Sequence, residues 1–192
     1  MIDQARIVGA VRTIIDSLGG EDAQRPGLVE TPRRIAEMYA EVFSGIEVDP
    51  VDELRTGFEE GHQEMVILKD IPFYSMCEHH FMPFYGIVHV GYIPSGRIVG
   101  IGKLARVVEV LSKRPQLQER LTSQIADTVM EGLNPRGVGV VIQAEHLCMT
   151  MRGIKKPGSN VVTSANRGIF RRNYATRTEF LELVNGRGTS SS

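Results

Sequence analysis

Two short clusters of cysteine and histidine hold the side chains of this sequence best suited to bind a transition metal. Cys77 is followed by His79 and His80, and His146 precedes Cys148 by two residues. The chain has 5 histidines among 192 residues. Chance placement would put only about 0.3 of them within three residues of a cysteine, which is fewer than the three observed. The clustering indicates metal ligands rather than buried cysteines with incidental histidines.

The spacing predicts one shared metal site. C-x-x-H spacing lets a tight turn direct Cys77 and His80 at one ion. We expect Val138–Met151 to form a strand on which His146 and Cys148 share a face. Thiolate and imidazole ligands without a group of acidic ones favour Zn²⁺ over calcium or magnesium.

The number of ligands decides between a catalytic and a structural zinc site. Cys77, His80 and Cys148 would leave a fourth position for water, as in catalytic sites. His79 and His146 would then serve as general acid–base groups beside that water. A second assignment stays open, in which His146 is the fourth ligand and the zinc is structural.

Basic residues near these clusters indicate an anionic substrate. Gly100–Arg106 formally matches the G-x-G-x-x-A dinucleotide pattern, which we reject because no alternating βαβ series surrounds it. A helix that begins there with Lys103 and Arg106 one turn apart can still hold an anion. Arg152 begins a segment, extending to residue 172, with six basic and no acidic residues. A positive segment beside Cys148 suggests a polyanion such as a nucleoside triphosphate, and a solvated basic face is the alternative.

Gln118 and Glu119 lie at the start of a predicted helix whose apolar stripe is already supplied by Leu117 and Leu121. A carboxylate can accept two N–H bonds from a guanine edge. Glu119 is therefore a candidate for base recognition, although an exposed helix surface explains the same residues without a ligand.

The elements that must position these side chains follow from hydrophobic periodicity. Helices are predicted at about 7–18, from Thr31 as N-cap to 43, and at 104–111, 117–133 and 177–184. Strands are predicted at 65–68, 87–93 and 138–151. The order of helices, strand pair, two helices, strand pair and helix predicts an α+β fold with mostly antiparallel strands.

Composition limits the class of protein. Lys and Arg number 22 against 23 Asp and Glu, so the net charge is −1. This balance argues against a nucleic-acid or membrane partner. We predict one structural domain made of a helical region with an acidic connector (1–62), a catalytic region (63–185) and a flexible tail (186–192). With two cysteines and neither a signal peptide nor an apolar span, we expect a cytoplasmic protein.

Four ordered segments resemble the GTP cyclohydrolase I family, zinc enzymes that open the imidazole ring of GTP. They are CEHH (77–80), GKLAR (102–106), RPQLQERLT (114–122) and EHLCMTMRG (145–153). The resemblance spans Thr31–Val184 and implies the tunnelling fold, an antiparallel sheet with helices packed on one face. It also implies a toroidal homodecamer of two pentamers with active sites between subunits.

The resemblance implies a role for each candidate residue. The zinc ligands would be Cys77, His80 and Cys148, and the catalytic histidines His79 and His146. The substrate-binding residues would be Gln118, Glu119, Lys103, Arg106, Arg152 and Arg34. Gly102 stands where the family commonly has serine, so one hydroxyl contact to phosphate is lost.

The implied reaction is attack of zinc-activated water on C8 of GTP. Formate is released and 7,8-dihydroneopterin triphosphate forms, the first step of tetrahydrofolate and pterin biosynthesis. One alternative is a non-catalytic, zinc-containing nucleotide-binding module of the same fold. Another is a different enzyme of this fold that acts on a related purine or pterin.

Overall fold

A five-stranded sheet forms the centre of the molecule in the computed structural model, which describes residues 2–186. Its strands, in spatial order, are β5 (Pro115–Gln116), β2 (Val66–Cys77), β3 (Pro83–Ile93), β6 (Gly137–His146) and β7 (Asn160–Gly168). Neighbouring strands are antiparallel except for the short parallel pair β2–β5. The α+β class with mostly antiparallel strands is confirmed. The tail predicted at 186–192 lies outside the described residues from 187 onward.

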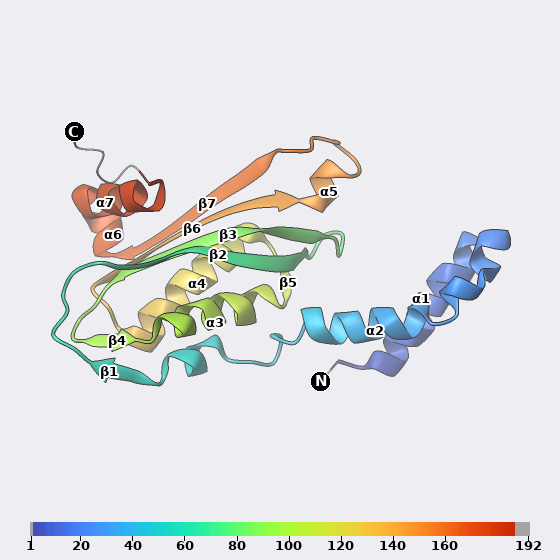
Figure 1. Ribbon diagram of the computed structural model, residues 1–192, viewed down its shortest axis with the longest axis horizontal. Coiled ribbons are helices and arrows are strands. Elements are labelled where there is room, and N and C mark those ends of the chain that lie inside the picture. Colours follow the sequence, from blue (N-terminus) through green and yellow to red (C-terminus); the bar gives the residue numbers. More distant parts are fainter. Residues whose placement is uncertain (1, 187–192) are drawn as a thin grey trace.

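Two long helices cover one face of the sheet (Figure 1). They are α3 (Ile101–Ser112) and α4 (Gln118–Leu133). Side chains on alternate positions of β3, such as Val88, Val90 and Tyr92, point into the core that these helices close. The period-2 alternation of a strand places these three residues on the same face.

The opposite face is covered at one end by α6 (Ile169–Arg172) and α7 (Tyr174–Val184). Phe170 and Phe180 pack over glycines of β3 and β6, where an added Cβ would lie 2.8 Å from a ring at Gly91 and 2.6 Å at Gly139. Because glycine has no Cβ, these positions leave room for the two rings, and α6 and α7 can approach the sheet closely. The expectation that helices pack on one face therefore holds for α3 and α4 but not for α7.

The N-terminal region forms a helical arm that projects from the sheet (Figure 1). It consists of α1 (Gln4–Leu18), the short 3₁₀ turns η1 (Glu21–Gln24) and η2 (Pro26–Leu28), and α2 (Thr31–Val42). The predicted N-cap is wrong: Glu30 occupies that position, and the Thr31 hydroxyl donates back to the carbonyl of Gly27 at 3.5 Å. The acidic connector contains η3 (Pro50–Leu54) and β1 (Gly57–Glu59), which pairs with β4 (Arg97–Val99).

The predicted strand 138–151 is too long. It ends at His146, and α5 (Leu147–Thr150) follows as a single helical turn. Cys148 therefore does not lie on the strand. No helix in the described part of the chain is long and apolar enough to cross a bilayer, and the cytoplasmic location stays a prediction.

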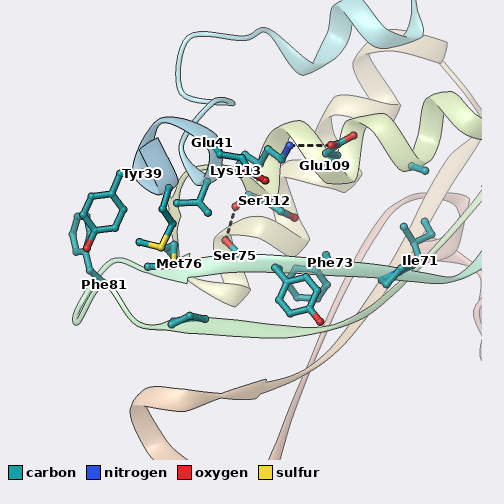
Figure 2. A pocket seen from close by; sticks show the side chains of 16 residues that line it. Tyr39, Glu41, Ile71, Phe73, Ser75, Met76, Phe81, Glu109, Ser112 and Lys113 are labelled. Atoms are coloured by element: carbon teal, nitrogen blue, oxygen red, sulfur yellow. Dashed lines mark hydrogen bonds and ion pairs between the residues drawn. The ribbon is translucent and has the colours of Figure 1, made fainter. Parts of the chain in front are cut away.

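Both outer strands leave backbone edges open within residues 2–186. β5 pairs with β2 only at Met76 and Cys77, and β7 is the last strand on its side. Beside the open edge of β2, a cavity of about 840 Å³ lies between α2, β2 and α3 (Figure 2). In its wall the Ser75 hydroxyl donates to the carbonyl of Ser112 at 2.7 Å. Open edges of this kind are natural places for a further strand to pair.

Candidate metal centre

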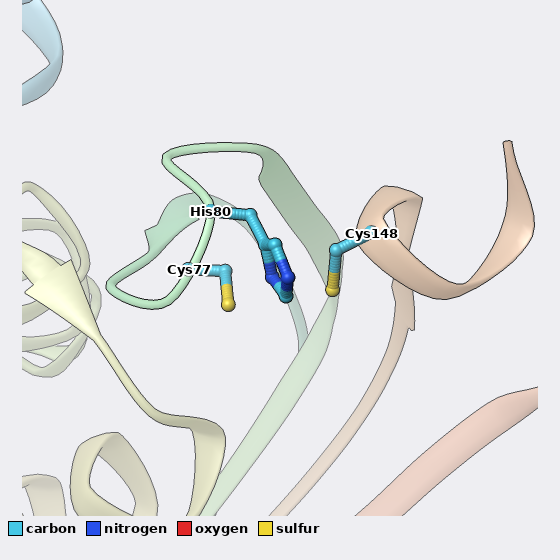
Figure 3. A group of neighbouring side chains, drawn as sticks. All are labelled: Cys77, His80 and Cys148. Atoms are coloured by element: carbon cyan, nitrogen blue, oxygen red, sulfur yellow. The ribbon is translucent and has the colours of Figure 1, made fainter. Parts of the chain in front are cut away.

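Three predicted ligands meet at one end of the sheet (Figure 3). Cys77 is the last residue of β2, His80 lies in the turn that follows, and Cys148 lies in α5. Their ligand atoms all lie within 4.8 Å of one another. Among the residues that the structure describes, this is the only group of three or more His, Cys, Asp or Glu side chains arranged in this way.

The sheet register explains how residues so far apart in sequence meet. Met76 pairs with Pro83 across the β2–β3 ladder, and Phe84 pairs with His146 across the β3–β6 ladder. The end of β2 and the end of β6 therefore flank the start of β3. The tight turn predicted from C-x-x-H closes with a bond from the Phe81 N–H to the carbonyl of Cys77 at 2.8 Å.

The donor set fits a zinc-like ion. Tetrahedral zinc with bonds of about 2.0–2.3 Å holds its ligand atoms about 3.5–3.8 Å apart, so only a small contraction of this group is required. Both cysteines are free thiols. Burial, and then the adjacent Cys77 thiol, raise the pKa of Cys148. A bound cation would stabilise the Cys148 thiolate against this rise, and such an ion is what the site would accommodate.

His146 lies beside these ligands but is not one of the group. Its ring stacks on Phe84, with centroids 4.6 Å apart and planes at 4°. Its Nε2 lies 2.8 Å from Oε1 of Gln118. Burial lowers the pKa of His146, and the charge of Glu119 partly opposes this. The assignment of His146 as a fourth ligand does not match this geometry.

An ion pair connects the turn that contains His80 to α4. Arg120 holds both carboxylate oxygens of Glu78, with N–O distances of 2.5 and 3.1 Å, and it lowers the pKa of that carboxyl. The Glu78 N–H also donates to the carbonyl of Gln116 at 3.0 Å. Neither side chain was predicted to contribute to the site, because no sequence spacing relates residues 78 and 120.

Comparison with known proteins identifies the family. The family model described as GTP cyclohydrolase I matches residues 7–185. The chain belongs to the GTP cyclohydrolase I family. Curated relatives named GTP cyclohydrolase 1 include one from Dehalococcoides mccartyi, 60% identical over 98% of this chain and 100% of the relative. Another, from Carboxydothermus hydrogenoformans, is 61% identical over 96% of each chain.

Comparison with solved structures gives a weaker similarity than that to these relatives of the GTP cyclohydrolase I family. One match is the crystal structure of the archaeosine synthase QueF-Like in the apo form, with 23% identity and a TM-score of 0.43. It covers 54% of this chain and 93% of that chain.

The cationic residues expected from the resemblance to the GTP cyclohydrolase I family lie in different parts of the molecule. Arg152 follows α5 closely enough for its charge to lower the pKa of Cys148, against the larger effect of burial. Lys103 lies in the first turn of α3 and Arg106 at its middle. The last residue of α3 leads into β5, which pairs with β2 at Cys77, and Figure 1 shows this course of the helix. At a rise of about 1.5 Å per residue, Lys103 lies about 13.5 Å and Arg106 about 9 Å along the helix axis from Ser112, the last residue of α3.

Other candidate residues lie on the surface or in ion pairs away from the three ligand atoms. Lys103 and Arg106 pair with Glu53 at 3.3 Å and with Glu109 at 2.7 Å. Arg34 lies exposed near the start of α2, on the arm. His79 is exposed, and its ring lies edge-on to that of His80, with centroids 6.3 Å apart. One chain thus gathers the metal ligands but leaves Lys103, Arg106 and Arg34 elsewhere.

Proposed function

We propose that this protein is a GTP cyclohydrolase I that converts GTP to formate and 7,8-dihydroneopterin triphosphate. The observation that carries the proposal is the Cys77, His80 and Cys148 group with the His146 imidazole held beside it. Curated relatives about 60% identical over nearly the full chain carry the name of this enzyme. The alternative of a non-catalytic module is not favoured, because the candidate reactive positions are filled.

Each side chain then has a defined task. Cys77, His80 and Cys148 would hold zinc, which when bound lowers the pKa of a coordinated water toward about 7. His146 and His79 would exchange protons with the purine ring as it opens. Glu119 is exposed in the first turn of α4.

The outer ends of the substrate would be held by charge complementarity. The carboxylate of Glu119 would accept N–H bonds from the guanine edge. The guanidinium of Arg152 would bind phosphate oxygens, which it can contact with two parallel bonds.

The direct test is turnover by the zinc-loaded full chain. Incubation with GTP is expected to release formate and to give a product that becomes a fluorescent pterin after oxidation. GTP that stays intact after long incubation with zinc-loaded, folded protein would contradict the proposal and favour the binding module.

We further propose that the active site is shared between chains of a homo-oligomer, in agreement with the toroidal decamer that the family resemblance implies. Two observations support this. Lys103 lies in the first turn of α3 and Arg106 at its middle, whereas it is the last residue of this helix that leads toward β5 and Cys77 of the same chain. Among residues 2–186, no strand pairs with the outer edge of β7 or with the part of the β2 edge that lies beyond β5. A neighbouring chain could then bring its cations to this metal centre.

Mixed oligomers test the shared site. A Lys103→Ala, Arg106→Ala double variant and a Cys148→Ser variant are each expected to be nearly inactive alone. Co-expressed one to one and purified through two tags, they should regain about a quarter of wild-type turnover, because about one interface in four combines two intact halves.

A matched mixture provides the control for this experiment. Cys148→Ser combined with His146→Ala places both defects in the metal half of the site, so no interface is complete and no activity should return. Equal recovery in both mixtures, or recovery in neither, would contradict a site shared in this way.

A further inference from the structure

The Gln118 side chain is buried and its amide hydrogens are used inside the chain. It is 1% exposed and occupies the first position of α4. Its Nε2 donates to the carbonyl of Ile142 on β6 at 3.2 Å and to that of Val161 on β7 at 2.9 Å. Because main-chain carbonyls only accept hydrogen bonds, the amide atom that faces these strands is the nitrogen. The amide oxygen must then face His146.

Two threonines support this orientation independently. The Thr122 hydroxyl donates to the carbonyl of Gln118 at 2.6 Å, which uses its only hydrogen. The Thr163 hydroxyl, 2.6 Å from that of Thr122, must therefore donate to Thr122. The Thr163 oxygen can still accept, and it lies 3.1 Å from Nε2 of Gln118, so that one of the two amide hydrogens is shared between two acceptors. These hydrogen bonds are all satisfied only if the nitrogen of the Gln118 amide, and not its oxygen, faces Thr163.

The amide oxygen determines which imidazole nitrogen carries a hydrogen. Oε1 of Gln118 lies 2.8 Å from Nε2 of His146. Because an amide oxygen accepts and cannot donate, Nε2 must supply the hydrogen. The stack on Phe84, with planes at 4°, sets the plane of the same ring. Gln118 and Phe84 together fix the orientation of the His146 imidazole.

We propose that Gln118 is a positioning residue: its amide oxygen keeps a hydrogen on Nε2 of His146, so that Nδ1 is the only nitrogen through which this imidazole exchanges protons. The proposal rests on the proposed function for the reaction in which His146 acts. It gives Gln118 a task other than the substrate contact that the resemblance implies. With both amide hydrogens bonded within the chain, none is left to donate to a bound nucleotide.

The resting, zinc-loaded protein provides the first test, which needs no substrate. In protein labelled with ¹⁵N-histidine, the 5 histidines give few signals, and the His146→Ala variant identifies those of His146. We expect its Nε2 to resonate as a protonated nitrogen and its Nδ1 as an unprotonated one. The reverse pattern would overturn the proposal even if GTP is converted, whereas failure to convert GTP would affect only the proposed function.

Substitution of Gln118 provides the second test. Gln118→Met keeps the approximate size and removes the acceptor, so we expect both tautomers of His146 and a kcat about 10- to 100-fold lower. The KM for GTP should change less than about threefold. Thr128→Val removes another buried polar group of α4 and should leave kcat and the ¹⁵N pattern unchanged. A loss confined to KM would identify Gln118 as a substrate contact and overturn its positioning role.

Discussion

Replacing Cys148 with serine is expected to abolish metal binding and to lower kcat/KM for GTP by about 1,000-fold or more. Cys148 is one of three side chains whose ligand atoms lie within 4.8 Å of one another. Two ligands hold zinc much less firmly than three, because a hydroxyl stays protonated where a thiolate would bind. Without the ion, the reaction loses about 4 kcal/mol of transition-state stabilisation.

Metal content and turnover are measured on the same preparation. Elemental analysis should find one zinc per chain in the wild type and almost none in the Cys148→Ser protein. Met149→Leu, a change of similar volume in the same helical turn, should keep both zinc and activity. Full turnover by a zinc-free Cys148→Ser protein would show that the cluster is not part of the active site.

Replacing His146 with alanine is expected to lower kcat by about 100- to 10,000-fold while the zinc content stays at one per chain. The size of this effect is that of a lost general acid–base group. Zinc should remain because His146 lies outside the group of ligand atoms. The variant therefore separates the chemistry of the imidazole from that of the metal ligands.

The control for His146→Ala is His62→Ala, which alters an exposed histidine of the connector and should leave both quantities unchanged. Two results would contradict the assignment. Full turnover in the His146→Ala protein would remove the histidine from the reaction. Loss of zinc together with activity would make His146 a metal ligand and would support the structural-zinc alternative.

The grouping of Cys77, His80 and Cys148 could be predicted from the sequence because residue type and short spacing carry most of the information. A C-x-x-H turn is a local structure, and the predicted tight turn is present, closed by the bond from the Phe81 N–H to the carbonyl of Cys77. The surroundings of Cys148 were predicted less well. The apolar run through Leu147 and Met149 contains neither glycine nor proline, so nothing local indicated that the strand ends at His146.

The environment of Gln118 could not be predicted, because its partners are distant in sequence. The carbonyls that it contacts are 24 and 43 residues further along the chain. Only the packing of α4 against β6 and β7 brings them together. The same limit applies to Lys103. A sequence motif shows that a cation is present, but it does not show whether that cation would serve the metal site of its own chain or that of a neighbouring chain.

The candidate metal ligands His80 and Cys148 and the neighbouring His146 are anchored to elements of unequal stability. His146 ends a strand paired with β3 at every position back to Gly137. Its backbone amides should therefore exchange with solvent deuterium only when the whole domain unfolds. His80 and Cys148 lie instead in a tight turn and a single helical turn, which can open locally at much lower cost. The lifetime of a bound ion should accordingly follow these local openings, and a protein that resists heat well could still release its metal quickly to a chelator.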